Sequence, residues 1–205
     1  MRLELRPLTL ALLLAAAPLG GCTGTAPPAP TELAPHQIAQ VPDGVTRTLV
    51  DFGGKLHLVG YEVTPARAAG PGDTVTVKLY WRVAGQLDRG FQLFTHLEDE
   101  RGRQLWNYDR EGAFRRVLGA LPGGLAAVPP GTLLLDEQTL TLPKAEQLAP
   151  RVVLVVGAWK KGKGDLWLRL PVLSGPSNGR SGGVIATLET PVPRRSPPPP
   201  GAPQR

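Results

Sequence analysis

Three histidines are the side chains of this chain best suited to proton transfer or metal binding: His36, His57 and His96. Their spacing matches neither His-x-His nor His-Glu-x-x-His, which are typical of metal sites, so we expect no metal and no cofactor. His96 lies near the end of a strand-like segment, where it could line a ligand site together with Asp99 or Asp109. The alternative is that His96 is half-buried and bonded to a backbone carbonyl.

Acidic residues stand next to one another at 98–100 and 136–137, and glycosidases use pairs of carboxyl groups as acid and base. Neighbours in a strand point to opposite faces, so adjacent acids cannot meet at one bond. Asp109 and Asp136 could meet only through the fold. We therefore interpret these acids as solvated charges in turns and at sheet edges. A serine hydrolase needs its nucleophile near a histidine, and we interpret Ser174-Gly175-Pro176 as a turn. These observations predict no catalytic residues, with a hydrolase that has acids at a strand end as the alternative.

Aromatic side chains are the remaining candidates for recognition, because exposed rings on a sheet suit stacking on sugars or contact with a protein. The alternation of the strands places Trp81 and Trp159 in core positions. We expect four further aromatic side chains to be partly exposed and to form one binding face together with His96. This face consists of Tyr80, His96, Trp106, Tyr108 and Trp167.

The elements that would position these residues are short strands. Residues 74–82 (TVTVKLYWR) alternate with a period of two, which is the best strand signal in the chain. Residues 152–159 form a continuous apolar run, which indicates a strand buried on both faces. The other expected strands span 55–63, with a bulge at Gly60, and 91–97, 104–108, 133–142, 166–170 and 184–188. Residues 113–121 are expected to form one or two helical turns. The pattern predicts an all-β fold, an Ig-like antiparallel β-sandwich of about 7–9 strands.

The N-terminus has the three parts of an export signal. Arg2 and Arg6 precede a charge-free apolar run at 8–19, which is too short for an ordinary spanning helix. Leu19, Gly20, Gly21 and Cys22 follow, and Cys22 is the only cysteine of the chain. This sequence resembles the lipobox of bacterial lipoproteins. The resemblance implies cleavage before Cys22, diacylglycerol and a further acyl chain such as palmitate on this residue, and stable attachment to a membrane.

The chain is expected to divide into a signal peptide at 1–21, a lipidated Cys and Pro/Ala-rich linker at 22–47, a β-sandwich at 48–190 and a disordered Pro/Arg-rich tail at 191–205. Residues 23–43 are expected to be extended. The net charge of +6 comes largely from the two ends, so it is weak support for nucleic-acid binding, which we do not expect. By analogy with other lipoproteins, Thr23 in place of an aspartate favours the outer membrane, facing the periplasm or the cell surface.

Several segments resemble a known bacterial module when they are taken in order. They are LVDFGGKLHLVGYEV, PGDTVTVKLYWRV, FQLFTHLEDERGRQL, LLDEQTLTLP, VVLVVGAWKKG and LRLPVLSGP. The module is an Ig-like β-sandwich found at the C-terminus of some bacterial membrane glycosyltransferases and in stand-alone exported proteins. The similarity covers residues 50–188 and carries over no catalytic residue. It implies a non-catalytic accessory domain outside the cytoplasm.

Together these observations predict a cell-envelope lipoprotein whose sandwich binds a glycan or a protein partner. A structural spacer between envelope components is the alternative, and a hydrolase of envelope polymers is a third.

Overall fold

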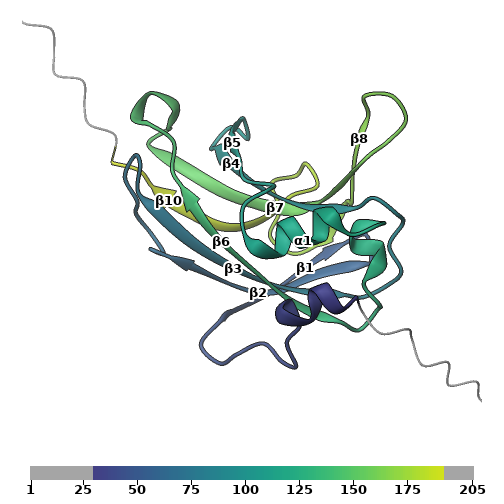
Figure 1. Ribbon diagram of the computed structural model, residues 1–205. Helices are drawn as coiled ribbons and strands as arrows, with labels where there is room; N and C mark the ends of the chain where they lie inside the picture. Colours follow the sequence, from purple (N-terminus) through teal and green to yellow (C-terminus); the bar gives the residue numbers. More distant parts are fainter. Residues whose placement is uncertain (1–29, 192–205) are drawn as a thin grey trace, which may run out of the picture.

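The computed structural model describes residues 30–191, and within this range the chain folds into two antiparallel β-sheets stacked face to face (Figure 1). The first sheet has the order β6-β3-β2-β1-β9, with β1 Thr46–Phe52, β2 Leu56–Thr64, β3 Thr74–Val83, β6 Leu133–Thr141 and β9 Val172–Ser174. The second has the order β10-β7-β4-β5, with β8 paired to β7; its strands are β4 Gln92–Asp99, β5 Gln104–Asn107, β7 Arg151–Lys161, β8 Trp167–Arg169 and β10 Gly183–Glu189. The all-β sandwich prediction is confirmed, with ten strands in the described range instead of 7–9.

The alternation in β3 sets the inner face of the first sheet. Val75, Val77, Leu79 and Trp81 are all fully buried, as the period of two predicts. The ring of Trp81 packs on that of Phe52, with their centroids 5.7 Å apart. The second sheet covers this layer with the inward side chains of β4 and β7. The core between the sheets is therefore made by two apolar stripes that are distant in the sequence.

Strand β7 is buried on both faces, as its apolar run predicts. Leu154 faces the core and Val155 points to the outer face, and both are fully buried. The outer face is covered because the segment after β9, which crosses from the first sheet to β10, passes over it. A Cβ atom on Gly182 in this segment would lie only 2.3 Å from the Cγ1 atom of Val155. The crossing segment is therefore in direct contact with the second sheet.

The helical prediction for 113–121 is also confirmed, since α1 spans Ala113–Ala120. Three short 3-10 helices accompany it: η1 Thr31–His36, η2 Gly124–Ala127 and η3 Ala145–Gln147. The extended linker expected at 23–43 is wrong in its second half, because η1 folds against the sandwich. Leu33 inserts into the core and is fully buried, and Val41 is 7% exposed. Burial of these apolar side chains offsets the entropy of ordering the segment.

The sequence pattern did not indicate two of the strands, β1 and β9. In β1 the register shifts between Arg47 and Val50 in its pairing with β2, and this irregularity interrupts the period of two. Strand β9 has three residues, too few to show a period. The expected bulge at Gly60 is present, where the pairing of β2 with β3 shifts between Leu58 and Gly60.

The predictions for the signal peptide, for Leu19, Gly20, Gly21 and Cys22, and for the tail after residue 191 lie outside the described residues. Within residues 30–191, no helix combines the length and the apolar character that crossing a membrane requires.

Candidate functional site

The five residues of the expected binding face do not share one surface. Trp106 and Trp167 are 42% and 61% exposed, which confirms their predicted exposure. They lie on β5 and β8, at opposite edges of the second sheet. Tyr80, His96 and Tyr108 are buried. The fold thus separates the two exposed rings and encloses the other three.

Tyr80 lies on the outer face of β3, as the alternation predicts, but this face is covered. Val41, Val45 and Leu133 pack around its ring, and its hydroxyl donates a hydrogen bond to Glu62. Burial, with Glu62 as a second cause, raises the pKa of the Tyr80 hydroxyl. The predicted exposure of Tyr80 is wrong because the segment before β1 folds back over the sheet.

Tyr108 directly follows β5, and its side chain belongs to the buried core. Its hydroxyl donates to the carbonyl oxygen of Thr141 over 2.9 Å, and burial raises its pKa. The predicted exposure of Tyr108 is therefore also wrong.

The predicted core position of Trp159 is wrong as well, because this side chain is more exposed than expected. It is partly exposed and packs edge-on against Trp167, with ring centroids 4.6 Å apart.

His96 meets Asp109, which is one of the two pairings expected from the sequence. Its Nε2 atom lies 3.3 Å from Oδ1 of Asp109, and its ring stacks on Phe94 at 4.6 Å. The same Asp109 oxygen accepts the backbone N–H of Thr95. The alternative, a bond from His96 to a backbone carbonyl, does not form within residues 30–191: Nδ1 has no hydrogen-bond partner there, and Nε2 lies near side-chain atoms only. The cluster fastens the chain after β5 to the outer face of β4, and no group of three potential metal ligands occurs in the described range.

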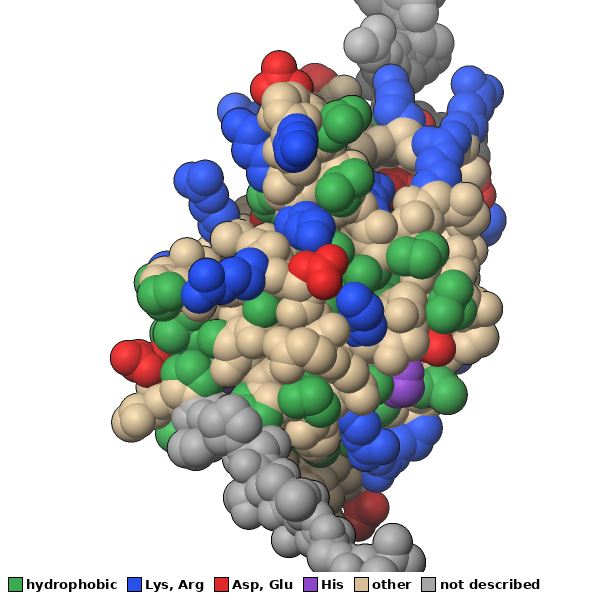
Figure 2. Space-filling model, turned by 90° about the vertical axis from the view of Figure 1, so that its right-hand side faces the viewer, with side chains coloured by type: hydrophobic (Ala, Val, Ile, Leu, Met, Phe, Trp, Pro, Cys, Tyr) green, Lys and Arg blue, Asp and Glu red, His purple; other side chains and the backbone are tan. Residues whose placement is uncertain are grey.

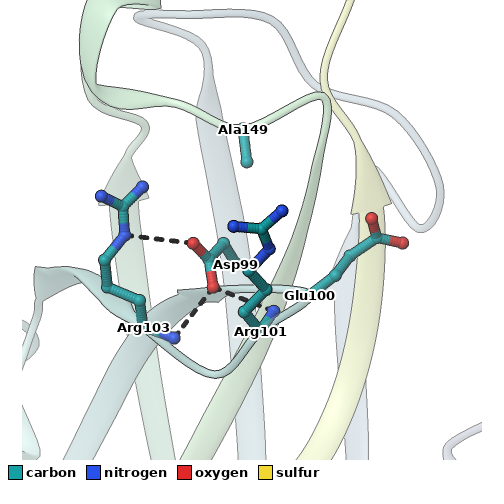
Figure 3. A pocket seen from close by; sticks show the side chains of 5 residues that line it. All are labelled: Asp99, Glu100, Arg101, Arg103 and Ala149. Carbon is teal, nitrogen blue, oxygen red and sulfur yellow. Dashed lines mark hydrogen bonds and ion pairs between the residues drawn. The ribbon is translucent and has the colours of Figure 1, made fainter.

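Asp99, the other expected partner of His96, instead organises the turn between β4 and β5. Its Oδ1 accepts the backbone N–H groups of Arg101 and Arg103, over 3.0 and 2.8 Å, and its Oδ2 accepts Nε of Arg103 over 3.1 Å (Figure 3). The backbone N–H of Arg103 is the main cause that holds the pKa of Asp99 below its ordinary value. An ionised carboxylate that already accepts three hydrogen bonds is poorly suited to act as a general acid.

Two open pockets flank this turn, and we call them the first and the second turn pocket. The first has a volume of about 360 Å³ and is lined by Asp99, Glu100, Arg101, Arg103 and Ala149 (Figure 3). The second has a volume of about 300 Å³ and is lined by Glu98, Asp99, Glu100, Arg101, Gly102, Val153, Asn178, Arg180, Val184 and Thr187. The second pocket lies where the crossing segment and β10 meet the β4–β5 turn.

The acids of the two turn pockets are all engaged. Glu98 is 5% exposed and accepts Nδ2 of Asn178, and Glu100 pairs with Arg151 at 2.9 Å. Asp99 holds the turn, as described above.

Two guanidinium groups of the second turn pocket have no such partner. Arg180 donates to the carbonyl oxygen of Gly102 over 2.8 Å. Neither Arg101 nor Arg180 forms an ion pair with any acid in the part of the chain that the structure describes. The second turn pocket therefore holds two guanidinium groups without an acidic partner of their own, beside the carboxylates of Glu98, Asp99 and Glu100.

The sequence analysis missed a buried polar network between the sheets. Arg115 of α1 donates from Nε to Oδ2 of Asp136 over 2.7 Å, with side chains 1% and 0% exposed. Its Nη2 donates to the hydroxyl of Thr95, which donates to Gln138. Burial raises the pKa of Asp136, and Arg115 opposes that rise. The interpretation of Asp136 as a solvated charge is therefore wrong. The alternation in β6 that places Leu140 inward also places Asp136 and Gln138 inward, and this signal could have found them.

Comparison of the chain with models of known protein families and with curated protein sequences finds no match in either.

Proposed function

We propose that this protein is a lipoprotein of the bacterial cell envelope whose β-sandwich binds, without catalysis, a glycan that carries acidic groups. The lipid attachment rests on Cys22 and the residues before it, and favours the outer membrane as the location. The observation that carries the binding proposal is the second turn pocket, where Arg101 and Arg180 lack acidic partners. Planar guanidinium groups bind carboxylate and phosphate well, because each can donate two parallel hydrogen bonds.

The character of the pocket also favours binding over hydrolysis. The acids that line it are each hydrogen-bonded or ion-paired, to Asn178, to Arg103 and to Arg151. A glycosidase needs a carboxyl group with a raised pKa as general acid, whereas the pKa of Asp99 is lowered. The lining side chains offer guanidinium, amide and hydroxyl groups as hydrogen-bond partners for the hydroxyl groups of a sugar chain.

The binding test uses the full-length protein on an array that pairs acidic glycans with neutral analogues of the same backbone. We expect retention on the acidic members only, and a loss of about tenfold to a hundredfold when Arg101→Gln and Arg180→Gln are combined, since each charged hydrogen bond contributes roughly 1.5–3 kcal/mol before screening. Arg116→Gln is the matched control, because Arg116 is exposed on α1 and lines neither turn pocket.

Three results contradict the proposal. Equal retention of acidic and neutral glycans would show that the guanidinium groups do not select the ligand. Binding of an acidic protein at the same arginines, with no glycan retained, would show that the ligand is a protein and not a glycan. Retention of nothing, with the folded protein recovered intact, favours the spacer role.

The membrane attachment is tested separately by mass spectrometry of the N-terminal peptide. We expect Cys22 at its first position with the mass of diacylglycerol and an acyl chain added. Cys22→Ala removes the thiol that takes up the lipid, so the protein should lose the added mass. A wild-type peptide that starts elsewhere or lacks the added mass overturns this part alone.

A further inference from the structure

The hairpin formed by the end of β7 and by β8 stands apart from the rest of the molecule. In this hairpin, residues 159–169, Trp159 pairs with Arg169 and Lys161 with Trp167. It projects from the body of the sandwich at the upper right of Figure 1. We call it the β8 hairpin.

The tip of the β8 hairpin exposes three consecutive apolar side chains. Leu166, Trp167 and Leu168 are 65%, 61% and 45% exposed. Successive side chains of a strand point to opposite faces, so a hairpin lying on the body would bury every second one. Neither face of this tip is covered, and the apolar side chains remain available to a partner outside the sandwich.

The base of the β8 hairpin is fastened to the body on both strands. Lys160 pairs with Asp88 at 3.0 Å, and its Nζ atom lies 4.7 Å from the centre of the Phe91 ring. On the other strand, the guanidinium of Arg169 lies over the ring of Phe94 at 4.8 Å. Contacts of this kind hold the hairpin in its projecting orientation.

The cations nearer the tip are not engaged in this way. Lys161 and Lys163 are exposed, and neither forms an ion pair with an acid of residues 30–191. Asp165 is the only acidic residue of the hairpin. The tip therefore joins a Trp and two Leu side chains to uncompensated lysines, a composition typical of segments that lie in the interface of an anionic bilayer.

The start of the described chain and the β8 hairpin both lie toward the right-hand end of the sandwich in Figure 1, with the hairpin at the top and η1 at the bottom. Residue 30 and η1 lie at the lower right of Figure 1, whereas the described chain ends at the left. Figure 2 looks onto this side and shows basic side chains interspersed with hydrophobic ones and fewer acidic ones. A fully extended chain spans at most about 3.3–3.6 Å per residue, so the eight steps from Cys22 to Pro30 can span at most roughly 30 Å. A lipid on Cys22 would hold this side of the sandwich close to the bilayer.

We propose that the β8 hairpin is a second membrane contact that docks on an anionic lipid surface. Trp167 lies at the level of the headgroups, Leu166 and Leu168 reach the boundary of the acyl chains, and Lys161 and Lys163 bind lipid phosphates. The inference rests on the proposed membrane location of the protein. Its consequence is a fixed orientation, in which two contacts hold one side of the sandwich to the bilayer.

The test uses the full-length protein, processed by the exporting host and reconstituted into vesicles of brominated phosphatidylcholine with or without brominated phosphatidylglycerol. Bromine atoms quench the emission of a Trp ring that touches the lipid. We expect quenching in the anionic vesicles, most of which disappears in Trp167→Phe. Combining Lys161→Gln with Lys163→Gln should weaken the contact about fivefold for each cation removed. Leu173→Ser is the matched control, because Leu173 is also 61% exposed but lies on β9.

Quenching that is absent from the wild type, or equally strong in Trp167→Phe, overturns the proposal. So does a dimer in sedimentation that Trp167→Phe dissociates, because the hairpin would then be an interface between two copies. The mass of the Cys22 peptide reports the lipid independently. Quenching without the added mass would support the hairpin contact and contradict the lipid anchor. Added mass without quenching would support the lipid anchor and contradict the hairpin contact.

Discussion

Two Arg–Asp pairs of this protein have the same chemistry and opposite surroundings. Arg115 and Asp136 meet at 2.7 Å between the sheets, with side chains almost completely buried. Arg103 and Asp99 meet at 3.1 Å in the β4–β5 turn, where the Arg103 side chain is 75% exposed. Burial raises the pKa of Asp136, whereas hydrogen bonds lower that of Asp99.

The fold depends on the buried pair, Arg115 with Asp136, whereas the exposed pair, Arg103 with Asp99, shapes a surface. A buried pair has lost its hydration, so each partner is needed to compensate the other. An exposed pair remains hydrated and contributes little to stability. The exposed pair contributes to the conformation of the turn, because Asp99 holds the turn that places Arg101 beside the second turn pocket.

The largest effect should come from breaking the buried pair on one side. Arg115→Ala leaves the carboxylate of Asp136 in the core without its counter-charge, and we expect the free energy of unfolding to fall by about 3–5 kcal/mol. Urea denaturation followed by Trp emission measures this change. Arg103→Ala, which breaks the exposed pair, is the control and should leave the stability almost unchanged. Equal losses for the two variants would remove the distinction between the pairs.

A smaller loss is expected at the neutral end of the buried network. Gln138 accepts the hydroxyl of Thr95 over 2.8 Å and donates to the carbonyl oxygen of Glu111 over 3.0 Å. Gln138→Leu keeps the volume and leaves both groups unsatisfied, at a cost of about 1–3 kcal/mol. Glu137→Leu is the control on the neighbouring, exposed position of β6. If denaturation shows the same stability for both variants, the network beyond the ion pair contributes nothing.

Replacing both charges together should cost less than removing one. Arg115→Met combined with Asp136→Leu leaves no uncompensated charge, and hydrophobic replacements of buried pairs are often neutral or better. We expect the free energy of unfolding to lie within about 2 kcal/mol of the wild-type value. A double variant that is as unstable as Arg115→Ala would show that the cavity, and not the charge, causes the loss.

The residues that sequence analysis placed correctly are those whose position depends on a local pattern. The inward face of β3 follows from its period of two, and the β4–β5 hairpin follows from the turn between two short strands. The helix at Ala113–Ala120 follows from the segment that precedes the Pro-Gly-Gly break. Tyr80 was placed on the correct face, but its burial depends on Val41 and Val45, which precede the first strand. No local pattern contains that contact.

The candidate site shows the same limit. The meeting of His96 and Asp109 was among the expected pairings because both lie near the ends of one hairpin. The ion pair of Arg115 with Asp136 joins α1 to β6. The alternation in β6 indicates that Asp136 points inward, but no sequence pattern indicates that Arg115 is its partner. The pairing of an acid with a particular arginine depends on how the two sheets stack, which alternation does not specify.

The smallest effect concerns the titration of the exposed pair. Because the folded-state pKa of Asp99 is lowered, its ionised form stabilises the fold above the pKa of the unfolded chain. This contribution is lost as the pH falls through the folded-state value. Carbon-detected NMR of the Asp99 carboxyl group should therefore show a pKa below that of an ordinary aspartate.

Arg103→Gln separates the causes of this shift. The variant removes the guanidinium but keeps the backbone N–H groups of Arg101 and of residue 103, which donate to Oδ1. The backbone bond from residue 103 is the main cause of the shift, so the pKa should rise only part of the way to its ordinary value. A complete return would assign the shift to the ion pair and make the turn dependent on charge. A partial return means that the turn keeps its shape without the arginine, and that Arg101 stays beside the second turn pocket even when the exposed pair is broken.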